Sequence, residues 1–153
     1  MSQYEILYFA DDPIVAQFEI GAVLGSLSPS GYLPHPRFST FVTINVQVRL
    51  QSIIDLTDVS SVETLLGANA QELTGDWKGY QERDAKTPVS APQGIAPTQQ
   101  LGEALFQERV EGFVSLSAKI PTHKTLMVFP ENLRSPSSLK FYDPSGALVH
   151  SVP

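Results

Sequence analysis

Glu19 is a carboxylate placed among apolar residues, and it is the most informative candidate for chemistry in the chain. It falls within an apolar stripe that has helical spacing and consists of Val15, Phe18, Ala22 and Val23. A carboxylate that faces the interior is costly unless it is paired or hydrogen-bonded. Glu19 therefore has either a structural partner or a task at a ligand, and the spacing alone leaves both interpretations open.

The other residue types that support common site chemistries are sparse or scattered. His35, His123 and His150 lie far apart in turn-like sequence, without the HxxxH-type spacing of a zinc site. His123 fits a turn between strands better than the role of a general base. The chain has no cysteine and no glycine pattern of the GxGxxG or P-loop type, which excludes thiolate ligands and the usual phosphate cradles. We therefore expect a site without a metal ion.

The segment around Glu19 predicts a strand followed by a helix. Residues 4–10 are mostly apolar and predict a strand. Asp12-Pro13 is a typical helix start, because an Asx side chain caps free N–H groups and proline is tolerated at the first helical position. The apolar spacing predicts a helix over 13–25, and prolines predict a loop over 28–36.

Regular alternation marks the clearest strand of the chain. Residues 38–50 alternate between polar and apolar side chains, with an apolar face formed by Val42, Ile44, Val46, Val48 and Leu50. Short helices are expected over 62–73. Residues 75–97 predict a loop, whose Trp77 and Tyr80 either anchor it over the core or contact a ligand.

The last third of the chain predicts one helix and three strands. The helix is expected over 97–109, with Leu101 and Leu105 facing inward and Ala104 as a further candidate. The strands are expected at 112–116, 125–129 and 139–142, with a turn at Asp143-Pro144-Ser145-Gly146. Strands and helices follow one another too irregularly for a βαβ winding, which favours the α+β class.

Composition places the chain among soluble globular proteins of one domain. Its 153 residues are 42% hydrophobic and 17% charged, enough for a single packed core. The net charge of −6 and the scattered basic residues argue against nucleic acid as a partner. No apolar run is long enough to span a bilayer and no signal peptide is recognisable, so a cytoplasmic location is the default expectation.

Four stretches form an ordered pattern over nearly the whole chain. They are LYFADDPIVAQFEIGAVL (7–24), LTGDWKGY (73–80), PTQQLGEALFQERVEGFVSLSAKIPTHKTLMVF (97–129) and LKFYDPSGAL (139–148). This ordered set resembles the RES domain family, named after characteristic arginine, glutamate and serine residues. The resemblance implies one domain over 1–153 with an ADP-ribosyltransferase-like α+β fold, that is, a mixed or antiparallel sheet core with flanking helices.

The resemblance also implies an activity and a set of site residues. Members consume NAD by breaking the nicotinamide–ribose bond, and act as toxins paired with an Xre-type antitoxin. By position, Tyr8 would lie near the dinucleotide, Glu19 would be the catalytic glutamate, and Ser117 the family serine. Ser115 shares the strand face of Ser117 and is the alternative serine.

These residue types suit such a reaction. Loss of nicotinamide develops positive charge on the ribose, as in the oxocarbenium-like transition state of glycoside cleavage. A fixed carboxylate stabilises that charge or orients a nucleophile. A tyrosine ring offers a flat surface for stacking, and a serine hydroxyl donates to a ribose or phosphate oxygen.

The family arginine marks the departure from the pattern. In the family, this arginine and a Gly-Arg-Trp-Asn-like run precede the tyrosine strand, whereas this sequence starts seven residues before Tyr8. Arginine is the natural bidentate clamp of a pyrophosphate. We therefore expect either a longer natural chain or a domain without this clamp.

The two function classes left open are an NAD glycohydrolase, phosphorylase or ADP-ribosyltransferase, and a catalytically degenerate RES-like binding module. The acceptor and a homo-oligomeric state also stay open.

Overall fold

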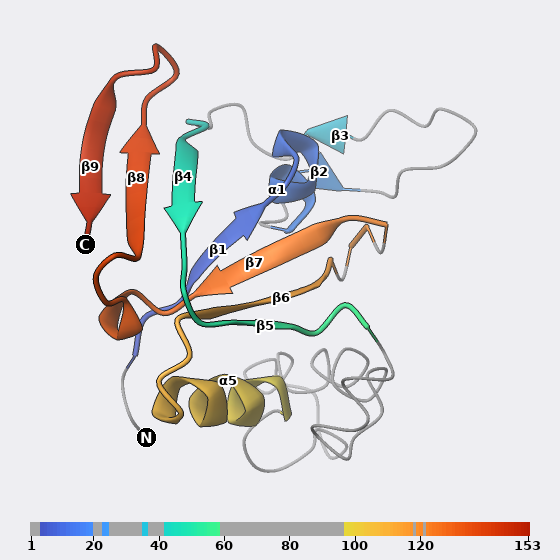
Figure 1. Cartoon of the computed structure of the whole chain (residues 1–153). Coiled ribbons are helices and arrows are strands. Elements are labelled where there is room, and N and C mark those ends of the chain that lie inside the picture. The colour runs from blue at the N-terminus through green and yellow to red at the C-terminus, as the bar shows by residue number, and fades with distance from the viewer. Residues whose placement is uncertain are drawn as a thin grey trace, which may run out of the picture.

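Four strands form the central sheet, in the order β1-β7-β6-β5 (Figure 1). They are β1 (Leu7–Ala10), β7 (Lys124–Val128), β6 (Gly112–Leu116) and β5 (Ile53–Asp55). Strand β7 is antiparallel to both neighbours, whereas β5 runs parallel to β6, so the sheet is mixed. The computed structural model describes residues 4–19, 23–24, 35–36, 42–58, 97–117, 119–120 and 122–153. The predicted helices over 62–73 and the loop with Trp77 and Tyr80 lie outside these residues.

Helix α5 (Pro97–Gln107) covers one face of the central sheet (Figure 1). The buried core between them consists of Leu105, Val110, Phe113, Met127 and Phe129, with Leu101 and Tyr4 packed against it. The inward positions of Leu101 and Leu105 confirm the predicted helix. Ala104 is exposed, contrary to expectation. The inward face of the helix also includes Gly102 and Phe106, and Ala104 lies on the opposite side of the helix from the centre of this face.

Helix α5 ends in a Schellman motif whose left-handed residue is not a glycine. Arg109 has φ 62° and its N–H donates to the Phe106 carbonyl at 3.0 Å, while the Val110 N–H donates to the Leu105 carbonyl at 3.2 Å. Leu105 and Val110 also pack together in the core, as this motif favours. The helix end is therefore held by two backbone bonds at the cost of a strained Arg109.

Replacing Arg109 with glycine is expected to raise the free energy of unfolding by about 0.5–1 kcal/mol, because glycine adopts this conformation without a Cβ clash. Glu108→Gly is the matched control, since the Glu108 N–H makes a helical bond to the Ala104 carbonyl at 3.0 Å. That control should lose about 0.5–1 kcal/mol. Urea denaturation of the three proteins measures both changes. A lower free energy of unfolding for R109G than for wild type would show that Arg109 is not strained at this position.

A second, antiparallel sheet has the order β4-β8-β9. Its strands are β4 (Asn45–Arg49), β8 (Ser138–Tyr142) and β9 (Leu148–Val152). Val46 and Val48 of β4 lie opposite Phe141 and Leu139, so the predicted apolar face is confirmed along this strand. Val42 and Ile44 belong to no strand and are exposed. Together the sheets and flanking helices confirm an α+β fold.

The first helix is shorter than predicted. Helix α1 spans Pro13–Glu19, and Val23–Leu24 form β2, which pairs with β3 (His35–Pro36). The predicted helix to residue 25 is therefore wrong at its end, and the predicted loop is wrong at His35–Pro36. The pairing partner lies more than ten residues away, so helical spacing alone does not reveal it.

Glu111 joins the two sheets through its buried carboxylate. It is 4% exposed and accepts four hydrogen bonds, from the N–H groups of Gln51 (2.6 Å), Ser52 (3.1 Å) and Arg134 (3.2 Å) and from the Ser137 hydroxyl (2.8 Å). Burial favours the neutral acid, but these four bonds outweigh it and hold the pKa of Glu111 below its ordinary value. The carboxylate thereby fixes the bend between β4 and β5 and the segment that leads into β8.

Candidate active site

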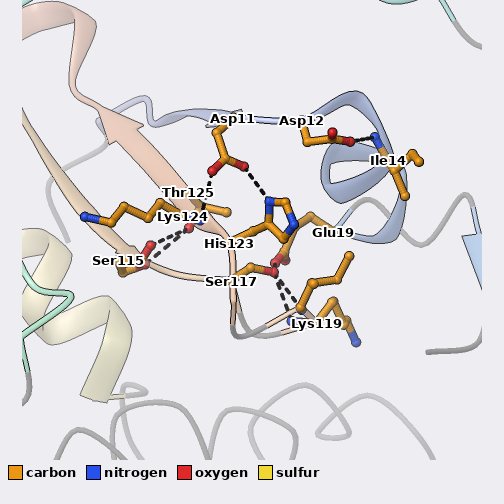
Figure 2. A network of polar contacts seen from close by, with 11 residues as sticks. Asp11, Asp12, Ile14, Glu19, Ser115, Ser117, Lys119, His123, Lys124 and Thr125 are labelled. Carbon is orange, nitrogen blue, oxygen red and sulfur yellow. Dashed lines mark hydrogen bonds and ion pairs between the residues drawn. The ribbon is translucent and has the colours of Figure 1, made fainter. Parts of the chain in front are cut away.

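The candidate site is formed by α1 and by the connection between β6 and β7, which meet at one end of the central sheet (Figures 1 and 2). Asp12 starts α1, because its carboxylate accepts the Ile14 N–H at 2.6 Å and its carbonyl accepts the Ala16 N–H at 3.1 Å. Pro13 follows at the first helical position. The predicted helix start is confirmed.

A small apolar cluster holds α1 against the β6–β7 connection. Val15 and Phe18 of α1 are buried together with Ile120 of the connection, and Ala10 at the end of β1 packs against them. Glu19 is the next residue after Phe18 and ends the helix, half-buried at the margin of this cluster. The apolar contact therefore brings the end of α1 next to the segment that carries Ser117.

Glu19 and Ser117 are joined by a hydrogen bond. The Ser117 hydroxyl donates to Glu19 Oε1 (Figure 2), although the two residues are 98 positions apart in the chain. Ser117 is 2% exposed, and its Oγ accepts the N–H groups of Lys119 at 3.2 Å and Ile120 at 3.0 Å. Since a hydroxyl has one proton and two lone pairs, these two donors direct the proton towards the carboxylate.

Ser115 lies on β6, two residues before Ser117 of the β6–β7 connection, and its side chain contacts a different residue. Its hydroxyl lies 3.2 Å from Thr125 Oγ1, its antiparallel partner on β7. Of the two serines that the sequence left open, Ser117 is therefore the one that meets Glu19. The reason is the chain direction after Leu116, where β6 ends and the connection turns towards α1.

Tyr8 lies on β1, in register with Met127 of β7, and is 72% exposed. It stands outside the hydrogen-bond network of Glu19 and Ser117. Strand β1 leads through Asp11 into α1, so Tyr8 and Glu19 belong to one continuous segment. An exposed ring on a strand provides a flat surface on which a base or nicotinamide ring could stack.

A second polar link connects the same two segments. Asp11 Oδ1 lies 3.1 Å from His123 Nδ1, and Asp11 Oδ2 accepts the Lys124 N–H at 3.4 Å (Figure 2). What little burial Asp11 has would raise its pKa, but the His123 and Lys124 contacts outweigh it and lower the pKa below its ordinary value. Sequence reasoning missed Asp11 and assigned His123 only to a turn, because their separation of 112 positions leaves no local signal.

The chemistry available here is that of an oriented carboxylate. A Glu held by a buried hydroxyl keeps its position while charge develops on a bound sugar, and this preorganisation is the basis of electrostatic catalysis. Lys119 lies on the same turn as Ser117 and contacts it through its backbone N–H (Figure 2). Within the described residues, no group of three or more His, Asp or Glu side chains is arranged to hold a metal ion.

Comparisons with known proteins identify a family for the chain. The family model described as RES domain matches residues 2–149, nearly the whole chain. A search of curated proteins and a search of solved structures each found no significant match. Among the described helices, none has the length and apolarity needed to cross a membrane.

Proposed function

Since the chain belongs to the RES domain family, we propose that it is an NAD-consuming, toxin-like enzyme that breaks the bond between nicotinamide and ribose. The observation that carries the proposal is the hydrogen bond from the buried Ser117 hydroxyl to Glu19, which orients one carboxylate at the junction of α1 and the β6–β7 connection. In this proposal Glu19 and Ser117 are the glutamate and the serine that characterise the family.

In this proposal each residue has a separate task. The bond between C1 of the ribose and the nicotinamide nitrogen breaks, and neutral nicotinamide leaves with the electron pair. An oxygen or nitrogen atom of the acceptor bonds to C1, and any proton on that atom is released to solvent. The Glu19 carboxylate stabilises the positive charge on the ribose. Ser117 keeps Glu19 in place, and the exposed Tyr8 ring stacks on the base or the nicotinamide.

NAD is the substrate in this proposal, and no metal ion takes part. The acceptor decides the enzyme class: water gives a glycohydrolase, phosphate a phosphorylase and a protein side chain an ADP-ribosyltransferase. A toxin of this kind would be held in check by a partner protein, for which an Xre-type antitoxin is our proposal. Expression without this partner should then deplete cellular NAD and stop growth.

The test is the release of nicotinamide from NAD by the purified chain, followed by chromatography. Incubation with and without phosphate distinguishes free ADP-ribose from ADP-ribose 1″-phosphate, and labelled NAD detects transfer to protein. Glu19→Gln at equal folded concentration is the matched control. If wild type releases nicotinamide no faster than E19Q without phosphate, with phosphate and in the presence of protein acceptors, the proposed enzymatic activity is refuted. NAD binding without turnover would favour the degenerate binding module.

A further inference from the structure

Asp11 and His123 repeat, a short distance away, the connection made by Glu19 and Ser117 (Figure 2). Asp11 precedes α1 and Glu19 ends it, so both carboxylates belong to one segment. Ser117 and His123 belong to the other segment, the connection between β6 and β7. Two carboxylates on one side thus hold two side chains on the other.

His123 is part of the same backbone turn as Ser117. The Ser117 N–H donates to the His123 carbonyl at 2.9 Å, and the His123 N–H donates to the Ile120 carbonyl at 2.9 Å. The Ile120 N–H in turn donates to Ser117 Oγ. A displacement of His123 is therefore transmitted to both the main chain and the hydroxyl of Ser117.

Asp11 holds this turn at two points. One carboxylate oxygen contacts the imidazole of His123, and the other accepts the N–H of Lys124, the first residue of β7. A carboxylate with two separate partners fixes the direction in which the turn leaves the sheet, which a single contact would not do. The His123 and Asp11 side chains are 36% and 51% exposed, so the pair contributes little to global stability.

We propose that Asp11 and His123 form a positioning pair that keeps the Ser117 hydroxyl aligned on Glu19. The pair acts through the turn between β6 and β7 and does not itself touch the reacting atoms. Its effect on catalysis rests on the proposed NAD-cleaving function, whereas its effect on the turn does not.

Two substitutions of His123 separate positioning from ring chemistry. An asparagine amide takes the place of Nδ1 and still donates to Asp11, but has no counterpart of Nε2, and alanine removes both. With H123A we expect kcat for nicotinamide release to fall roughly ten- to a hundredfold at little change in KM, as for a small misplacement of a catalytic group. H123N should recover most of this loss. T122A, an exposed neighbour in the same turn, is the matched control and should retain the wild-type rate.

Native-state hydrogen exchange gives a readout that does not depend on activity. The Ser117 and Ile120 amides should exchange about tenfold faster or more in H123A than in wild type, and near the wild-type rate in H123N. D11A is the second variant if H123A does not fold, since alanine removes both contacts of Asp11. It should also accelerate exchange at these amides.

The outcomes of the two measurements are distinct. An H123N variant as slow in turnover as H123A would overturn the proposal in favour of a direct role of the ring. Unchanged exchange in H123A and D11A would overturn it as well. If wild type and E19Q release nicotinamide equally slowly, the proposed function fails, while the exchange data still decide whether the pair holds the turn.

Discussion

Replacing Glu19 with glutamine is expected to lower the rate of nicotinamide release from NAD by a factor of about 10²–10³. Glutamine has almost the same shape and can still accept the Ser117 hydroxyl through its amide oxygen. What it loses is the negative charge facing the cation-like ribose. The measurement is the initial rate at saturating NAD, with equal folded concentrations of both proteins. Equal rates would remove Glu19 from the mechanism.

Ser117→Ala provides the control that links the rate to the observed hydrogen bond. If Ser117 acts by orienting Glu19, its removal lowers the rate in wild type but has little further effect in E19Q, because the two residues work as one unit. Independent, multiplying losses would instead show that the hydroxyl contacts the substrate separately. Thermal unfolding of wild type, E19Q, S117A and the double variant establishes that the comparison is between folded proteins.

Replacing Glu111 with alanine is expected to lower the free energy of unfolding by about 3–5 kcal/mol. The substitution leaves three N–H groups and one hydroxyl without their shared acceptor, at a residue that is 4% exposed. Such a loss is a large part of the stability of a domain of this size. Urea denaturation measures it, and a change below about 1 kcal/mol would show that water replaces the carboxylate at little cost.

Glu111→Gln removes the charge of Glu111 at nearly constant shape, and it therefore tests how this carboxylate makes stability depend on pH. The folded pKa of Glu111 lies below its ordinary value of 4.5, so the carboxylate stabilises the fold fully above that value. This contribution decreases as the pH falls below about 4.5 towards the folded pKa, where the unfolded chain binds more protons. The glutamine variant should therefore show a flatter loss of stability in acid than wild type. If the free energy of unfolding of the variant falls with decreasing pH as steeply as that of wild type, the acid sensitivity comes from other carboxylates.

Much of the fold follows from local patterns, and the errors have a common physical origin. The strand over 112–116, the helix that begins at Pro97 and the apolar face of Val46 and Val48 are evident in spacing and alternation. Strands β5 and β9 were not predicted. β5 has three residues and is defined by its parallel partner β6, while β9 is mostly exposed and has little apolar alternation.

The candidate site was accessible from the sequence only in part. Glu19 stands out because a carboxylate interrupts an apolar stripe, and Ser117 came from family resemblance. That the two meet follows from packing of Val15 and Phe18 on Ile120, which no periodicity encodes. Glu111 and the Asp11–His123 pair were missed for the same reason, since all their side-chain partners are remote in the chain.

Because β1 pairs with β7, the central sheet cannot form during synthesis until the chain has been made as far as β7. Glu19 leaves the ribosome 98 residues before Ser117, and at about 5–20 residues per second this interval is about 5–20 s. During that time β1 has no β7 to pair with and Asp11 has no His123. The two halves of the site meet only after β7, which ends at Val128, has been made. If the chain consumes NAD as proposed, it would stay inactive until β7 has been made, and a partner protein could be present by then to bind it.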